Sequence, residues 1–191
     1  MRRIIVCVLL FAVLSTALLA AKDIPQWIYE DSLSDGEYHY EWGSAKQGNM
    51  QQSIKRAKAA ARDNIAEWVK TCVHEIVLSY YNEAGEADYA KQAMDVFENL
   101  SIQHANAILA GTEQVEMYFD KNGDFDKPGT VYILMRIPVA NIKSELSGIA
   151  KDSNVQKSFK KSGSAKEANE MLNAAIDKYF ALNNEKDENE L

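Results

Sequence analysis

The feature that most constrains the fold is a set of apolar residues spaced three and four positions apart between Met50 and Leu78. This spacing places them on one face of an amphipathic α-helix. Three of the helix positions, 57, 60 and 61, are alanines, so another element can approach closely there, and a sheet with bulky strand residues is the expected neighbour. The stripe consists of Met50, Ile54, Ala57, Ala61, Ile65, Trp68, Cys72 and Ile76.

Three other segments show strand patterns. Residues 37–42 alternate between polar side chains and the aromatic stripe Tyr38, Tyr40 and Trp42, and Gly43 is expected to end that strand. Alternate aromatic residues on a strand more commonly belong to a core than to a ligand site. Residues 114–119 and 131–137 flank a segment rich in Asp, Asn, Gly and Pro, which predicts an antiparallel hairpin.

These elements predict an α+β fold, in which a small antiparallel sheet of about three strands is covered on one face by the long amphipathic helix. A weaker helix is expected over residues 87–100. A C-terminal helix, opened by a capping box of Ser164 and Glu167, is expected to dock on the domain, with pairing to another protein as the alternative. The predicted divisions are 1–21 signal peptide, 22–36 extended leader, 37–147 α+β domain, 148–163 linker, 164–183 C-terminal helix and 184–191 disordered acidic tail.

The N-terminus has the layout of a secretory signal peptide. Arg2 and Arg3 precede the uncharged apolar run 4–14, and small residues follow at Ala20 and Ala21, where cleavage is expected. Retention as a membrane anchor is the alternative, although a spanning helix needs about 20 apolar residues. We therefore expect a periplasmic or secreted protein.

The cysteines argue against two kinds of covalent attachment. Cys7 lies near the start of the apolar run rather than at its end, so bacterial lipidation is not expected. Cys72 is then the only cysteine of the processed chain, which excludes an internal disulfide. A buried, unreactive thiol is the expected role of Cys72.

The charge balance excludes some partners. The 191-residue chain has 28 acidic and 21 basic residues, for a net charge of −7, and loss of the signal peptide would shift this to about −9. Such a chain lacks the basic footprint that nucleic acids require. It is also repelled by anionic lipid head groups.

Two motifs resemble metal sites, and both fail at named positions. His74-Glu75 begins like the zinc-protease motif HExxH, but Leu78 stands where the second histidine must be. Residues 120–126 begin like a calcium loop, but Phe125 and Val131 replace the required Gly and Glu. A hairpin turn is the preferred interpretation of that loop, and weak divalent-cation binding is a hypothesis.

Motifs for the common catalytic and nucleotide-binding sites are absent from the sequence. It contains no GxSxG elbow, Walker loop or GxGxxG. Residues 160–164, Lys-Lys-Ser-Gly-Ser, lack the strand-loop-helix setting that phosphate binding needs. We therefore expect no enzyme, and no catalytic, cofactor-binding or metal-binding residue.

Three short segments resemble the LPP20-type lipoprotein family: residues 25–27, Pro-Gln-Trp; 40–45, Tyr-Glu-Trp-Gly-Ser-Ala; and the alanine-rich 57–62. Residues 109–134 are similar to the later part of that family, and the N-terminal domain of FlgT-type flagellar periplasmic proteins is also similar. The likeness covers about residues 25–140. It implies an envelope protein with a helix-on-sheet domain and no catalytic residues, although the acylated cysteine is missing here.

The expected function is therefore a non-catalytic interaction or accessory module of a periplasmic or outer-membrane assembly. Its partners would be envelope proteins, without nucleic acid or a lipid anchor. Binding is expected at an exposed sheet edge or on the C-terminal helix. The alternative is a carrier that holds a small apolar or peptide ligand between helix and sheet, in the space left by Ala57, Ala60 and Ala61.

Overall fold

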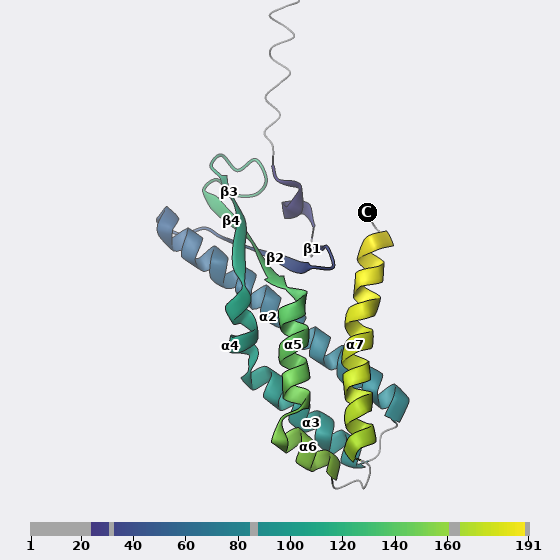
Figure 1. The fold of residues 1–191 in the computed structure, drawn as a ribbon. Helices are drawn as coiled ribbons and strands as arrows, with labels where there is room; N and C mark the ends of the chain where they lie inside the picture. Colours follow the sequence, from purple (N-terminus) through teal and green to yellow (C-terminus); the bar gives the residue numbers. More distant parts are fainter. Residues whose placement is uncertain (1–23, 31–32, 85–87, 161–164, 190–191) are drawn as a thin grey trace, which may run out of the picture.

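The computed structural model describes residues 24–30, 33–84, 88–160 and 165–189; within these ranges, side chains 88–90, 106, 160 and 182–189 are not described. The signal peptide predicted at 1–21 and Ser164 of the predicted capping box lie outside the described residues. The predicted α+β fold is confirmed (Figure 1).

The sheet has four antiparallel strands in the order β1-β2-β4-β3. They are β1 (Leu33–Ser34), β2 (Tyr38–Ala45), β3 (Glu113–Asp120) and β4 (Thr130–Pro138). β3 and β4 form the predicted hairpin. The two-residue β1 is the strand that sequence patterns missed, because it is too short to show an alternation.

Helix α2 (Met50–Ala84) lies across β2 and β4, and its backbone comes close to the sheet at Gly43. A Cβ atom at Gly43 would lie 2.5 Å from the carbonyl oxygen of Ala57 and 2.9 Å from the carbonyl carbon of Ala60, and closer still to the nitrogen of Ala61. The prediction that Gly43 ends the strand is wrong. It lies inside β2, where the absence of a side chain lets the helix backbone approach the sheet.

The aromatic stripe of β2 faces away from α2. Trp42 and Tyr40 pack at the edge of a second, smaller core formed by Trp27, Ile28, Tyr132 and Leu134. Trp27 and Ile28 belong to the 3-10 helix η1 (Gln26–Tyr29), so part of the predicted extended leader is a helical turn that covers this second face of the sheet. The bulky strand residues that pack in the core with Ala57 and Ala61 come from β4, at Val131 and Ile133, and not from the aromatic stripe of β2.

The remaining helices form a second half of the molecule around the C-terminal part of α2 (Figure 1). In the C-terminal helix, Leu172, Ile176 and Phe180 are buried in the main core, which confirms that this helix docks on the domain. The elements are α3 (Asp88–Gln103), α4 (Ala105–Ile108), η2 (Leu109–Gly111), α5 (Val139–Ala150), α6 (Ser153–Lys160) and α7 (Ala165–Asn189).

Two predicted irregular segments are helical. The predicted linker 148–163 contains α6, whose Val155 and Phe159 are fully buried. The Asp152 carboxylate caps the start of this helix, because it accepts a hydrogen bond from the N–H of Asn154 at 2.7 Å. The predicted disordered tail 184–191 continues α7 as far as Asn189. Adding residues to a docked helix avoids the cost of a new nucleus, so a polar sequence can follow it.

Among the described residues, no helix is both long and apolar enough to cross a membrane.

Candidate functional site

The histidines do not form a metal site. His74 and His104 are exposed on the helical half, and within the described ranges no three His, Cys, Asp or Glu side chains come together as a metal site would require. His74 follows the buried Val73 on α2, and its own side chain is exposed to solvent.

Asp120 is the structural centre of the β3–β4 loop. Its fully buried carboxylate accepts hydrogen bonds from the N–H groups of residues 123, 124, 125 and 126, at 2.7–3.1 Å. Burial alone would raise the pKa of Asp120, but these four donors outweigh it and hold the pKa below its usual value. The carboxylate oxygens that resembled calcium ligands are therefore engaged by the backbone.

Cys72 has the expected buried character. Its side chain is fully buried, and the Tyr179 hydroxyl donates a hydrogen bond to the Cys72 sulfur at 3.2 Å. Burial raises the pKa of the Cys72 thiol to about 12, so the reactive thiolate is not populated at neutral pH.

A buried polar pair lies between β2 and α2, and sequence reasoning missed it. His39 and Glu41 are 2% and 9% exposed, and the Nε2 atom of His39 is 3.0 Å from a carboxylate oxygen of Glu41. The imidazole ring stacks on Trp68 of α2, with 3.6 Å between ring centroids and 7° between the planes. Through the stacking on Trp68, this buried pair forms a direct contact between β2 and α2. The sequence signal that could have found this pair is the alternation of residues 37–42, which places His39 and Glu41 on the same face of the strand as Gly43.

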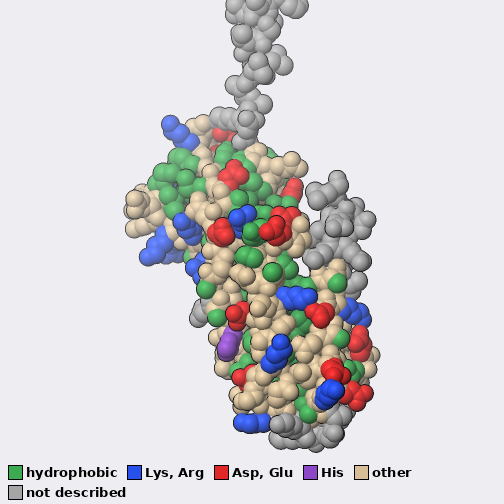
Figure 2. Space-filling view, in the orientation of Figure 1, with side chains coloured by type: hydrophobic (Ala, Val, Ile, Leu, Met, Phe, Trp, Pro, Cys, Tyr) green, Lys and Arg blue, Asp and Glu red, His purple; other side chains and the backbone are tan. Residues whose placement is uncertain are grey.

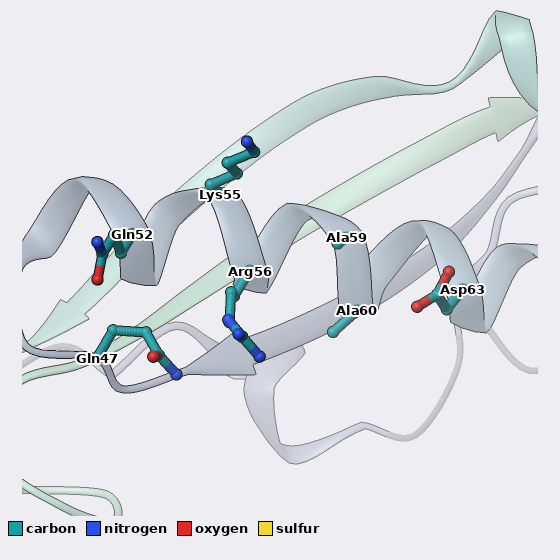
Figure 3. Close-up of a pocket in the computed structure, with 7 residues that line it drawn as sticks. All are labelled: Gln47, Gln52, Lys55, Arg56, Ala59, Ala60 and Asp63. Carbon is teal, nitrogen blue, oxygen red and sulfur yellow. The ribbon is translucent and has the colours of Figure 1, made fainter.

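An open groove of about 660 Å³ runs along α2 beside the end of β2 (Figure 3). Arg56 and Gln47 extend on the β2 side of the helix, whereas Lys55 points to the opposite side. The groove is lined by one guanidinium, one ammonium, two amides and a single carboxylate, and among these described residues no hydrogen bond or ion pair joins the charged groups to one another. Its lining residues are Gln47, Gln52, Lys55, Arg56, Ala59, Ala60 and Asp63.

The most unusual surface is on β3. Val115, Met117 and Phe119 are 45%, 41% and 37% exposed. Phe119 and Met117 pair with Val131 and Ile133 of β4, which are buried under α2, so both lie on the helix side of the sheet. Because α2 lies over β2 and β4, the helix side of β3 is left uncovered.

The free edge of β3 also carries backbone hydrogen-bonding groups. N–H and C=O groups alternate between the two neighbours of an antiparallel strand. The carbonyl oxygen of Tyr38 accepts a hydrogen bond from the N–H of Asp35, so the backbone groups of Tyr38 point toward β1 and those of the next residue, His39, point toward β4. Because His39 pairs with Ile137, the backbone groups of residues 131, 133, 135 and 137 of β4 point toward β2, and those of residues 130, 132 and 134 point toward β3. Their partners on β3 are Asp120, Tyr118 and Glu116. The backbone N–H groups of Met117 and Phe119 therefore point away from the sheet.

We use the term β3 surface for this combination: the exposed side chains of Val115, Met117 and Phe119 and the outward backbone of the same strand. Figure 2 shows hydrophobic side chains gathered at the β3 end of the molecule, with Lys and Arg side chains beside them.

Neither a protein-family model nor a curated protein matches the sequence of this chain.

Proposed function

We propose that this chain is an exported, non-catalytic interaction module of a cell-envelope assembly, and that it binds its partner at the β3 surface. The observation that carries the proposal is an edge strand of eight residues whose apolar side chains and backbone donors are exposed together. Soluble proteins usually shield such edges, because an exposed apolar edge pairs readily with other chains.

The proposed mode of binding is strand addition. A register shift between Gln114 and Glu116 interrupts the pairing with β4, and the strand is regular from Glu116 to Asp120. An extended segment of the partner would pair with this regular part, since its backbone can satisfy the outward N–H groups of Met117 and Phe119. Its alternate side chains would pack beside Met117 and Phe119 on the helix side.

The structure around β3 suits a rigid docking strand. Trp27 donates a hydrogen bond to Glu116 at 2.9 Å, and Arg136 pairs with Glu113 at 3.2 Å while stacking on the Tyr38 ring at 4.0 Å. These contacts hold β3 from the side opposite α2. A strand fixed before binding loses little conformational entropy when the partner arrives.

The cellular location is inferred from the sequence. The charged pair Arg2-Arg3, the apolar run and Ala20-Ala21 support export, and the likeness to LPP20-type proteins supports an envelope role. With no acylated cysteine at the end of the apolar run, a bound partner is the proposed means by which the protein associates with the outer membrane.

The carrier alternative relied on space beside the alanines of α2. Gly43 packs directly against the backbone of Ala57 and Ala61, and the groove lined by Ala60 is open to solvent. No observation favours a ligand held between helix and sheet, so we retain the interaction module alone.

The proposal is tested by site-specific photo-cross-linking in the cells that make the protein. A photoreactive phenylalanine analogue replaces Met117 or, as a control, Ile102, which is 51% exposed on α3. We expect one reproducible cross-linked product from position 117 that is absent from position 102. Equal products from both positions, or none from position 117, would contradict the proposal.

A pair of variants separates the side chain from the backbone. Met117→Gln removes the apolar side chain, and Met117→Pro also removes the outward N–H without breaking a hydrogen bond to β4. The cross-linked product, captured through position 119, should weaken in the first variant and disappear in the second. Ile102→Gln is the matched control and should leave it unchanged.

A further inference from the structure

We infer that the segment bound at the β3 surface is acidic, and that a row of basic side chains on α2 recognises its carboxylates. This inference rests on the proposed function, because it names the chemistry of the partner at the same strand.

The row consists of Lys55, Lys58 and Arg62, which are all exposed. Steps of three and four residues place them on one side of α2. Arg62 donates a hydrogen bond to the carbonyl of Leu109 at 3.3 Å, and Leu109 begins the turn η2 that leads directly into β3. The side of α2 that carries this row therefore faces β3.

The other side of the helix faces the opposite edge of the sheet. There, Asn64 donates a hydrogen bond to the carbonyl of Trp42 at 2.9 Å, and Arg56 points into the open groove beside β2. Figure 3 shows Lys55 on the side of the helix away from Arg56. Lys55 also borders the groove that Arg56 enters, but its side chain extends on the β3 side of the helix.

The strand register shows which residues of β3 lie beside each basic side chain of the row. Met117 pairs with Ile133, and Ile133 pairs with Gly43, which lies against Ala57 and Ala61. Lys58 follows Ala57 in the same turn of the helix, so it lies at about the level of Met117. Lys55 lies one turn toward the Phe119 end, and Arg62 lies one turn toward the start of β3.

Acidic neighbours do not neutralise the row. Glu113 and Glu116 lie on the other face of β3, where Arg136 and Trp27 engage them, and Asp120 is enclosed by its loop. Among the described residues, no ion pair involves Lys55, Lys58 or Arg62. A basic row beside an apolar strand is unexpected on a chain of net charge −7 and complements an acidic ligand.

A strand added to β3 would lie about 4.8 Å beyond it. Carboxylates on its helix side would point into the space above β3 toward the Lys55 and Lys58 side chains. On the other face they would meet Glu116 and be repelled. The expected ligand therefore alternates, with acidic and apolar side chains on the helix side and neutral or basic ones on the far side.

A second copy of the chain does not fit this description. Antiparallel pairing of two β3 strands about a two-fold axis would place both α2 helices on the same face of the joined sheet. It would bring two basic rows together and supply no carboxylate on the helix side. Electrostatic repulsion therefore disfavours self-pairing and leaves an acidic partner as the occupant.

The test uses a displayed library of random peptides, selected for binding to the full chain. Selected peptides are sorted by whether Met117→Pro or Met117→Gln weakens their binding, measured by fluorescence anisotropy. We expect the β3-dependent peptides to be enriched in Asp and Glu at alternate positions, and their affinity to fall as salt is added.

Charge reversal on the row is compared with a matched control. Lys55→Glu/Lys58→Glu should weaken the β3-dependent peptides by about tenfold or more, because it replaces attraction with repulsion near the bound strand. Lys91→Glu/Lys157→Glu makes the same change in net charge on exposed positions of α3 and α6 and should change affinity by less than about twofold.

The outcomes separate the two proposals. If β3-dependent peptides show no acidic enrichment, or if both double variants have the same effect, the acidic-partner inference is wrong and the strand-addition site stands. If no selected peptide depends on Met117, the site itself is wrong, and the inference falls with it.

Discussion

Replacing Gly43 with alanine should destabilise the fold far more than a single methyl group suggests. The new Cβ would overlap the backbone of α2 at Ala57, Ala60 and Ala61, at 2.5 Å from the Ala57 oxygen. Backbone atoms of a packed helix cannot rotate out of the way as a side chain can. To restore an ordinary contact of about 3.5 Å, α2 has to move about 1 Å away from β2.

The expected magnitude follows from this displacement. Overpacking of a core costs about 1–3 kcal/mol, and a gap of about 1 Å along the helix-sheet contact removes further dispersion energy from Ala57, Ala61 and Ile65. Alanine restricts the unfolded chain more than glycine and returns about 0.4–1 kcal/mol. The net loss in the free energy of unfolding should be about 2–4 kcal/mol, or roughly 5–15 °C in Tm.

The assay is urea unfolding followed by circular dichroism, with two comparison variants. Gly148→Ala on α5 meets no atom within 4 Å and should stabilise the protein by about 0.5–1 kcal/mol through helix propensity. Gly43→Ala/Ala61→Gly should not recover stability, because the clash is with the backbone of residue 61. A Gly43→Ala variant within about 0.5 kcal/mol of the parent, or rescue by Ala61→Gly, would refute this account of the contact.

Four further predictions concern the rest of the molecule. Asp120→Asn should cost about 1–2 kcal/mol at pH 7 by weakening the hydrogen bonds that close the loop. The pKa of Asp120 in the folded protein lies below the unfolded value of 3.8, so the ionised carboxylate stabilises the fold fully above about pH 4. This stabilisation is lost as the pH falls through the folded pKa. Asp120→Asn has no carboxylate to protonate, so its free energy of unfolding should not show this loss at acid pH. Millimolar calcium should leave the Tm of the parent unchanged, and a rise would show that the carboxylate is free to bind metal. Cys72 should resist alkylation at pH 8 in the native protein and react after unfolding, as read by peptide mapping; rapid native labelling would contradict its burial. Deletion of residues 164–191 should abolish cooperative thermal unfolding, since it removes the buried face of α7, and a truncated chain that melts as sharply as the parent would show that α7 is dispensable.

The helices and the hairpin are the parts of the fold that the sequence predicts well. Spacing from Ala57 to Ile76 is enough to predict α2, because a single buried face repeats over many turns. The β3–β4 hairpin follows from two strand patterns around a segment of turn residues. Both are local patterns, which depend little on the rest of the chain.

The orientation of β2 could not be predicted in the same way. Tyr38, Tyr40 and Trp42 are the larger apolar set, yet α2 covers His39, Glu41 and Gly43. Since apolar material covers both faces of this sheet, hydrophobicity does not identify the face that meets the helix. The close approach at Gly43 decides it, and a glycine in a sequence is equally consistent with a strand end.

The β3 surface depends on the same contact. Alternation in residues 115–119 predicts a strand, but whether its apolar side is covered depends on where α2 crosses the sheet. That position is set by Gly43 against Ala57 and Ala61, residues distant from β3 in the chain. Likewise, Gly148 and Ser153 suggested a linker, whereas the Asp152 cap begins another buried helix.

The uninterrupted length of α2 has a mechanical consequence. Its 35 residues extend about 52 Å, and the first half carries the sheet while the second half carries α7. Tension applied to a strand held at β3 would pass through β4 and β2 into the helix and along its axis to the far end of the molecule. Because α2 continues from Met50 to Ala84 without a break, a molecule with this load path would transmit such a pull from one end to the other as a stiff spacer.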